Sequence, residues 1–131
     1  MSVRAYVDSS ALVKLVVREP ESAALRAFLR RRTARASCAL ARVEVLRAVR
    51  HHGPAAIARA HQVVERLELM RLDDGLLDAA ARLPIEPLRS LDAIHLAAAQ
   101  RLGHDLSVLV SYDERMLAAA RRLGIPVASP L

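Results

Sequence analysis

The chain has 131 residues, of which 53% are apolar, enough for a single domain over residues 1–131 with its own hydrophobic core. No apolar run approaches the roughly 20 residues of a membrane span. Residues 1–7 lead into a strand pattern rather than a signal peptide, so we expect a cytoplasmic protein without membrane association. Cys38 is the only cysteine, which excludes a disulfide framework and a thiolate zinc site.

The formal charge is +6, and all but one of the 20 basic residues are arginine. Arginine binds phosphate through paired hydrogen bonds, so nucleic acid is a natural partner, although genomic base composition alone also replaces lysine by arginine. Aromatic residues make up only 2% of the chain. Any contact with a single strand would therefore depend on phosphates rather than on base stacking.

The first half of the chain alternates strand and helix patterns. Residues 3–7 form an apolar strand that stops at Asp8, and Ser9 and Ser10 are expected to cap the next helix. Helices are predicted at 11–17, 20–32, 40–52 and 54–67, with strands at 35–38 and 68–72. The arginines at 30–32 most simply form the solvated end of the second helix.

In the second half, Asp73 or Asp74 begins a helix that extends to residue 83, and residues 84–89 form a loop with two prolines. The stretch LRSLDAIHLAAAQ follows, with Ser90 as the expected N-cap and Asp92 in the first turn. From 91 to 99 only Asp92 and His95 are polar, which predicts a helix buried on every side. A strand at 108–110, a helix capped by Asp113 and an edge strand at 125–128 complete the chain.

This alternation predicts an α/β fold, with a central parallel sheet of about four to five strands and helices on both faces. Ligands bind at the carboxyl ends of such strands. Asp8 and Asp113 follow strands there, and they converge with Asp92 if the first and fourth strands are neighbours. Acids held close together repel, so we expect a hard divalent cation, Mg²⁺ or Mn²⁺, between them.

Four segments in order resemble the PIN-domain nucleases, and more narrowly the VapC-type toxins of toxin–antitoxin pairs. They are VDSSALVKL at Asp8, ARVEVLRA at Glu44, RSLDAIHLAAA at Asp92 and VSYDERMLAAARRLG at Asp113. The likeness spans essentially the whole chain. It implies a PIN-like fold in which the acids matching these four bind Mg²⁺ or Mn²⁺ and support RNA cleavage. Ser111 matches a small hydroxyl residue beside the last acid.

The expected activity is metal-dependent hydrolysis of RNA phosphodiester bonds by an endoribonuclease toxin. Asp8, Asp92 and Asp113 would hold the metal ion. Glu44, whose place in the site rests on the resemblance, would bind the metal or hold a metal-bound or attacking water. Ser111 would orient an acid or a phosphate. Some relatives carry a further Asn or Asp, where this chain has the neighbouring Glu114, so the number of metal ions stays open.

Further expectations concern the substrate and the partners. Arg89 is a candidate phosphate contact or, equally, a structural salt-bridge partner, and Ser9 is a second candidate substrate contact. A cognate antitoxin is expected to cover the acidic pocket with a basic side chain. Helices at 21–32 and 54–67 offer a self-complementary patch for a homodimer.

Each acid also has an ordinary explanation. Asp113 is a good N-cap, Asp8 ends a strand, and Glu44 could pair with Arg47 at i,i+3. The default role of His95 is that of a hydrogen-bonded core histidine. These structural roles are compatible with a metal-binding site, but they would also explain the residues without one.

Other classes of protein fit less well. A phosphoaspartate phosphatase needs an acid where Ser10 stands, and a receiver domain needs a late lysine, whereas Lys14 is the only lysine. The remaining alternative is a catalytically degenerate PIN fold that serves as an RNA-binding or partner-binding module. Retention of all four acids favours the enzyme.

Overall fold

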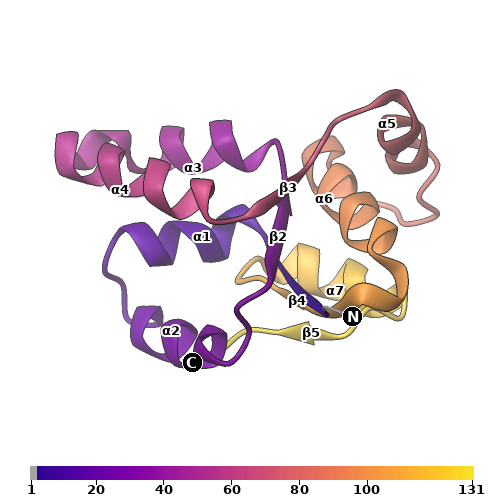
Figure 1. The fold of residues 1–131 in the computed structure, drawn as a ribbon. Helices are drawn as coiled ribbons and strands as arrows, with labels where there is room; N and C mark the ends of the chain where they lie inside the picture. The colour runs from indigo at the N-terminus through magenta and orange to yellow at the C-terminus, as the bar shows by residue number, and fades with distance from the viewer. Residues whose placement is uncertain (1–2) are drawn as a thin grey trace.

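The computed structural model describes residues 3–131. In this part of the chain, five parallel strands form one sheet in the order β3-β2-β1-β4-β5 (Figure 1). They are β1 (Arg4–Val7), β2 (Arg35–Cys38), β3 (Glu68–Met70), β4 (Leu106–Val110) and β5 (Val127–Ala128). The predicted α/β class is confirmed. The first and fourth strands are neighbours, which is the condition on which the expected convergence of the acids depended. The part of the first predicted strand pattern at residues 1–2 lies outside the described residues.

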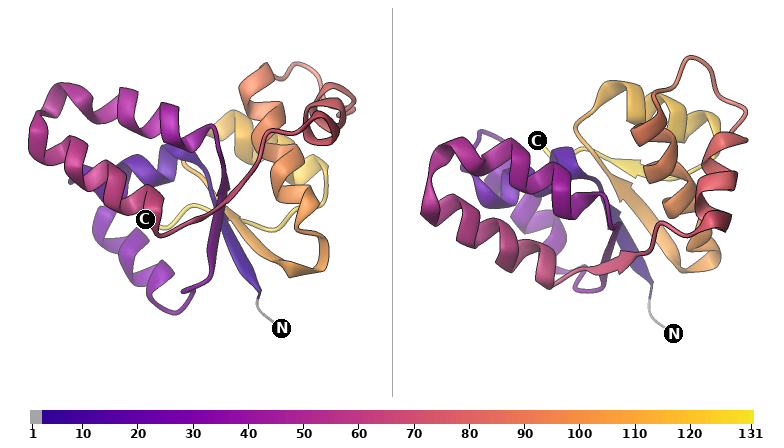
Figure 2. Two further views of the ribbon diagram at one scale, coloured as in Figure 1. Left: turned by 45° about the horizontal axis from the view of Figure 1, so that its top comes forward. Right: turned by 90° about the horizontal axis from the view of Figure 1, so that it is seen from above.

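Helices cover both faces of the sheet. They are α1 (Ser9–Val16), α2 (Ser22–Arg30), α3 (Ala41–Val49), α4 (Pro54–Glu65), α5 (Asp74–Ala81), α6 (Ser90–Arg101) and α7 (Glu114–Arg122). Helices α1 to α4 lie on one side and α5 to α7 on the other (Figure 2). Within residues 3–131, none of these helices has the length and apolar character that crossing a bilayer requires.

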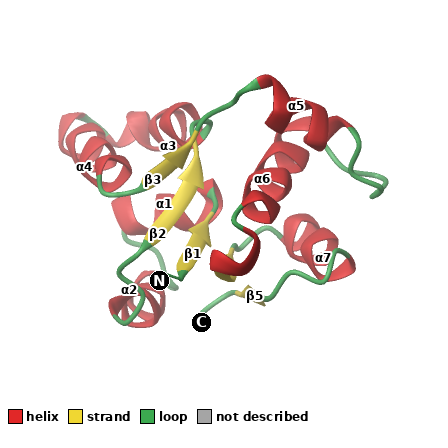
Figure 3. Ribbon diagram, turned by 45° about the vertical axis from the view of Figure 1, so that its right-hand side comes forward, coloured by secondary structure: helices red, strands yellow, loops and turns green. Residues whose placement is uncertain are grey.

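The sheet separates two apolar cores, because side chains alternate between its faces. Tyr6 packs with Leu96 and Met116 on the side of α6 and α7, whereas Val7 packs with Leu12 and Val45 on the side of α1 and α3. The central strand β1 therefore ends between the two layers of helices (Figure 3). Asp8, the next residue, lies at this junction.

Two helix caps differ from the sequence prediction. Asp8, not Ser9 or Ser10, caps α1, and its carboxylate accepts from the N–H of Ala11. In α6 the N-cap is Arg89, and Ser90 is already the first helical residue without a capping bond. In both helices the N-cap is the last extended residue, which stands before the serines that were predicted to cap. Only Asp8 makes a side-chain capping bond there.

The predicted burial of α6 also fails at its first turn. Leu91 is 48% exposed, and continuous burial begins further along the helix at His95. The helix predicted at 40–52 also changes, because its last turn is a 3₁₀ turn and Gly53, with a φ of 100°, reverses the chain into α4. The second helix begins at Ser22 rather than at Pro20.

Candidate active site

The carboxyl ends of β1 and β4 lie side by side, because Val7 is in register with Val110. Asp8 and Ser111 follow these residues, and both are buried. The Ser111 hydroxyl donates to one carboxylate oxygen of Asp8. The other oxygen accepts from the Ser10 hydroxyl at 2.7 Å and from the N–H of Ala11 at 3.1 Å. Each oxygen of Asp8 is therefore held by a protein donor.

Ser10 and Ser111 connect the two turns that carry the acids. The N–H of Tyr112 donates to the Ser10 oxygen at 2.9 Å, and the N–H of Asp113 donates to the Ser111 oxygen at 3.0 Å. The two hydroxyls thus fix the start of α7 relative to Asp8. Sequence reasoning did not place Ser10 in the site, although it stands in the same VDSS segment as Asp8.

Asp113 caps α7, as predicted. One of its carboxylate oxygens accepts from the N–H groups of Arg115 and Met116, at 2.9 and 3.3 Å. The side chain is only partly buried. The capping role does not compete with a role in the site, because it uses one oxygen of the two.

Asp92 is the acid that the protein leaves incompletely bonded. Its side chain is only 15% exposed, and within the described residues its buried Oδ2 has no hydrogen-bond donor. The nearest cation is the Nε of Arg89 at 3.5 Å, an ion pair too long for a good hydrogen bond. Burial, followed by the nearby charge of Asp113, raises the pKa of Asp92. The charge of Asp113 therefore acts on Asp92.

The pKa of Asp8 is raised as well, for a different reason. Burial penalises its charge, and the hydrogen bonds from Ser10 and Ser111 offset only part of that penalty. Two acids of the site thus hold their charge at an energetic cost, which a bound cation would lower.

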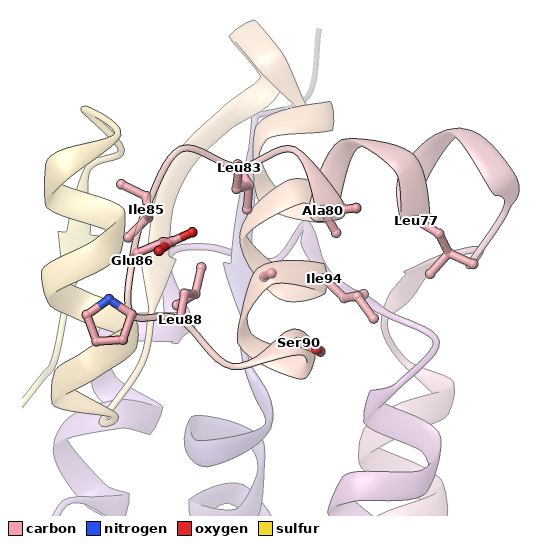
Figure 4. Close-up of a pocket in the computed structure, with 11 residues that line it drawn as sticks. Leu77, Ala80, Leu83, Ile85, Glu86, Leu88, Ser90 and Ile94 are labelled. Atoms are coloured by element: carbon pink, nitrogen blue, oxygen red, sulfur yellow. The ribbon is translucent and has the colours of Figure 1, made fainter.

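Two cavities border the start of α6. A cavity of about 180 Å³ is lined by Pro87, Leu88, Arg89, Asp92 and Arg115. It places two guanidinium groups next to Asp92, and Arg115 was not predicted, although it stands two residues after Asp113. The second cavity, of about 490 Å³, lies under the 84–89 loop between α5 and α6 (Figure 4). Its lining is mostly apolar and contains none of the predicted site residues.

Within the described residues, Glu44 on α3 contacts Ser9 and His95 instead of forming the alternative pair with Arg47. Its Oε1 accepts from the Ser9 hydroxyl and pairs with the Nε2 of His95, both at 2.7 Å. Burial alone would raise the pKa of Glu44, but the hydrogen bonds from His95 and Ser9 outweigh it and lower the pKa. Glu44 is therefore a stably ionised carboxylate whose position is set by α1 and α6.

His95 is a hydrogen-bonded core histidine, as its default interpretation predicted, and it is 2% exposed. Its Nδ1 lies 2.8 Å from the Tyr6 hydroxyl and 3.6 Å from the sulfur of Cys38. Burial would lower its pKa, but the hydrogen bonds with Cys38 and Glu44 raise it to about 10. The sequence did not reveal that this residue links the core to Glu44.

The residues fit a hard cation in their chemistry, although they do not form a closed ligand cage. Within residues 3–131, no three His, Cys, Asp or Glu side chains are arranged as a ready metal site. Mg²⁺ is commonly held by one or two carboxylates and completed by waters and substrate phosphates, so such a cage is not required. The buried oxygen of Asp92, which has no hydrogen-bond donor in the described structure, is the kind of ligand atom that this ion uses.

Comparison with known proteins assigns the class. The family model described as "PIN domain" matches residues 5–122, and the chain belongs to the PIN-domain family. It is 54% identical to Ribonuclease VapC46 of Mycobacterium tuberculosis over 125 residues, which cover 95% of this chain and 96% of that protein. The chain is therefore a PIN protein of the VapC type, as its sequence motifs predicted.

Two solved structures share the fold. A toxin–antitoxin complex from Klebsiella pneumoniae matches with a TM-score of 0.73 and 22% identity, covering 97% of this chain and 98% of that one. The crystal structure of Mycobacterium tuberculosis VapC20, a sarcin-ricin loop cleaving toxin, matches with a TM-score of 0.71 and 15% identity, covering 88% and 94%. At these identities the likeness confirms the PIN-like fold.

Proposed function

We propose that the chain is an endoribonuclease that depends on Mg²⁺ or Mn²⁺ and acts as the toxin of a toxin–antitoxin pair. The PIN-domain match and the 54% identity to a ribonuclease support the activity. The observation that carries the metal dependence is the buried oxygen of Asp92, which lacks a donor within the described residues. Burial and the charge of Asp113 also raise the pKa of this carboxyl group.

In this proposal, Asp92 and Asp113 are ligands of the ion, with Asp8 as the third acid. When bound, the ion would activate a water and stabilise charge on the phosphate and on the leaving oxygen. Ser111 and Ser10 hold Asp8 in one orientation. Glu44, kept ionised by His95 and Ser9, completes the acid set and orients the attacking water.

The substrate phosphate is assigned to the small cavity beside Asp92. Arg89 is 67% exposed and is held by Asp92 only through a long ion pair, so its remaining N–H groups are available to a ligand. Arg115 lines the same cavity. Two guanidinium groups next to an acid-held ion give the charge pattern that a phosphodiester requires.

The test of the activity is cleavage of end-labelled mixed RNA by the purified chain in Mg²⁺, in Mn²⁺ and in EDTA. We expect fragments in either metal and none in EDTA. Cleavage that persists in EDTA would contradict the metal dependence. RNA binding that is indifferent to EDTA, with no cleavage under any condition, would instead support the degenerate PIN-fold module.

The proposed inhibitor is a small antitoxin whose basic side chain enters the acidic pocket. The matching complex from Klebsiella pneumoniae supports a partner of this kind. Opposite charge is the direct way to occupy the acids within a protein whose formal charge is +6. Co-expression with the adjacent gene should yield a stable complex without nuclease activity. A pair that never associates would contradict this part of the proposal.

A homodimer through α2 and α4 stays a prediction from the sequence. Light scattering at protein concentrations of tens of micromolar tests it directly, and a monomeric mass would contradict the prediction.

A further inference from the structure

None of the four predicted acids lines a cavity of about 540 Å³, in which every charged lining side chain is basic. The polar lining residues are Arg26, Arg30, Arg35, Arg59, Gln62 and Arg66. They come from α2, the start of β2 and α4, while Leu12 and Leu15 of α1 form part of the apolar floor. Helix α1 packs against both α2 and α4, and residues of all three helices line this arginine cavity.

Helical spacing directs these arginines into one space. On α4, Arg59, Gln62 and Arg66 recur at i, i+3 and i+7, which is a single helix face. On α2, Arg26 and Arg30 stand at i and i+4. Two helices that are far apart in the chain thus present arginines to each other across the same cavity.

The positive charge of the arginine cavity is not balanced by the protein. Within residues 3–131, none of its five arginines takes part in an ion pair, whereas Arg4 and Arg101 elsewhere pair with Glu68 and Asp73. Arg35 donates only to the carbonyls of Leu29 and Arg32, at 2.7 and 2.8 Å. Burial and the nearby charge of Arg66 lower the pKa of Arg35. Like charges are therefore held together where an anion would relieve their repulsion.

We propose that the arginine cavity binds backbone phosphates of the RNA strand whose cleavage occurs at the acids. This proposal rests on the proposed ribonuclease function in one respect, which is the identification of the bound polyanion as RNA. Guanidinium groups bind phosphate oxygens in pairs, and contacts to phosphates hold a strand without reading its bases. Helix α1 links the two places: Asp8 caps its start, and Leu15 stands about 10 Å further along the helix.

The charge pattern favours RNA over the other occupants. A second copy that paired through this same cavity would set its arginines against those of the first and would be repelled. The homodimer predicted through α2 and α4 would therefore have to use other faces of these helices. An acidic protein segment carries the right sign, but its charges are spread irregularly over flexible side chains. A polynucleotide presents a phosphate at every nucleotide, which suits arginines on two facing helices.

The test is binding of a fluorescein-labelled single-stranded RNA in EDTA, which prevents metal-dependent cleavage. We compare the wild type with the double variant R59Q/R66Q and with the control R121Q/R122Q, which removes the same charge from the exposed end of α7. Loss of two phosphate contacts should make the slope of log K against log[salt] shallower by about 1.4 and weaken binding about 10- to 30-fold at 0.1 M salt. The control should change the affinity by less than about 3-fold. Circular dichroism confirms that both variants are folded.

The outcomes separate this proposal from the proposed function. If the wild type binds RNA without cleaving it, and R59Q/R66Q shows the expected loss of RNA affinity, the proposed role of the arginine cavity would be supported. The proposed nuclease activity would be contradicted. If the wild type cleaves RNA and R59Q/R66Q binds RNA as tightly as the wild type does, only the proposed role of the arginine cavity would be overturned. A labelled oligoglutamate run in parallel covers the protein alternative. If R59Q/R66Q lost affinity for that peptide and kept it for RNA, the RNA assignment would be overturned.

Discussion

Asp8 and Asp92 are acids of the same candidate site, but the protein treats them in opposite ways. Asp8 accepts hydrogen bonds on both oxygens and forms the N-cap of α1. Asp92 keeps one buried oxygen without a donor in the described structure and has only a long ion pair with Arg89. Asp8 is thus already held by the scaffold of the protein, whereas Asp92 keeps an oxygen without a protein donor. This difference supports the proposal that Asp92 binds a ligand from outside the chain.

The largest expected effect is on cleavage by the variant D92N. Removal of a metal ligand should lower kcat/KM for RNA in Mg²⁺ by about 1000-fold, the scale of several kcal/mol of lost charge stabilisation. Thermal melting in EDTA should show that the variant folds at least as well as the wild type, because a repelled charge has been removed. The matched control is E114Q, which neutralises an exposed acid on α7. If D92N cleaved RNA as fast as this control, a role for Asp92 in catalysis would be contradicted.

The comparison becomes sharper when each acid is replaced by alanine in a separate variant and the two variants are unfolded in urea with EDTA. Asp8→Ala deletes a cap and leaves the donors of Ser10, Ser111 and Ala11 unpaired, so we expect a loss of about 2–3 kcal/mol in the free energy of unfolding. Asp92→Ala deletes an acid without hydrogen bonds to Oδ2 and should change stability by less than about 1 kcal/mol. Equal losses in the two variants would contradict the distinction between scaffold and ligand.

A smaller effect on cleavage is expected from a substitution of His95, the buried partner of Glu44. H95Q cannot hold Glu44 and the Tyr6 hydroxyl in the present geometry, so the cleavage rate should fall by about 10-fold. The fall should appear in kcat rather than in KM, because His95 does not line the cavity that contains Arg89 and Arg115. The control Y6F keeps the contact between His95 and Glu44 and should lose less activity. Unchanged kcat in folded H95Q would show that the network is only structural.

The alternation of strands and helices and the acids at the strand ends could be predicted from the sequence, whereas the order of the strands in the sheet could not. Strand and helix periods alternate clearly, and an acid that follows a strand must lie at the carboxyl edge of a parallel sheet. The resemblance to a family supplied Glu44, because the direction in which α3 points it depends on how that helix packs against α1 and α6. On the sequence alone, the pairing with Arg47 was an equally sound expectation.

What the sequence could not predict depends on packing between distant segments. Ser10 acts on Asp8 and also on Tyr112, more than 100 residues away, which no local pattern indicates. The arginine cavity exists because α1 holds α2 and α4 on either side of it, and each helix alone looks like an ordinary basic surface. The same limit explains the caps at Asp8 and Arg89, where a shift of one residue depends on where the strand or loop stops.

The smallest effect, and the most direct check on the charge of Asp92, is the pH dependence of stability in EDTA. The native pKa values of Asp8 and Asp92 are raised, so the folded state binds these protons more tightly than the unfolded state does. Their charges cost stability at pH 7, and that cost falls as the pH is lowered from 7 towards 5. Glu44 has a lowered pKa, and its contribution is lost only as the pH falls through that lower value, below this window.

His95 does not reverse the trend. Its native pKa is raised to about 10, so its contribution is complete below its ordinary value and is lost as the pH rises towards 10. Between pH 5 and 7 it adds a small gain on acidification, which is common to the wild type and to D92N. Subtracting the two pH profiles of the free energy of unfolding therefore isolates Asp92. We expect the wild type to gain more than D92N, by about 1 kcal/mol or less for each unit by which the pKa of Asp92 is raised. Identical profiles would mean that Asp92 carries its charge without cost, and the reason for a cation beside it would be lost.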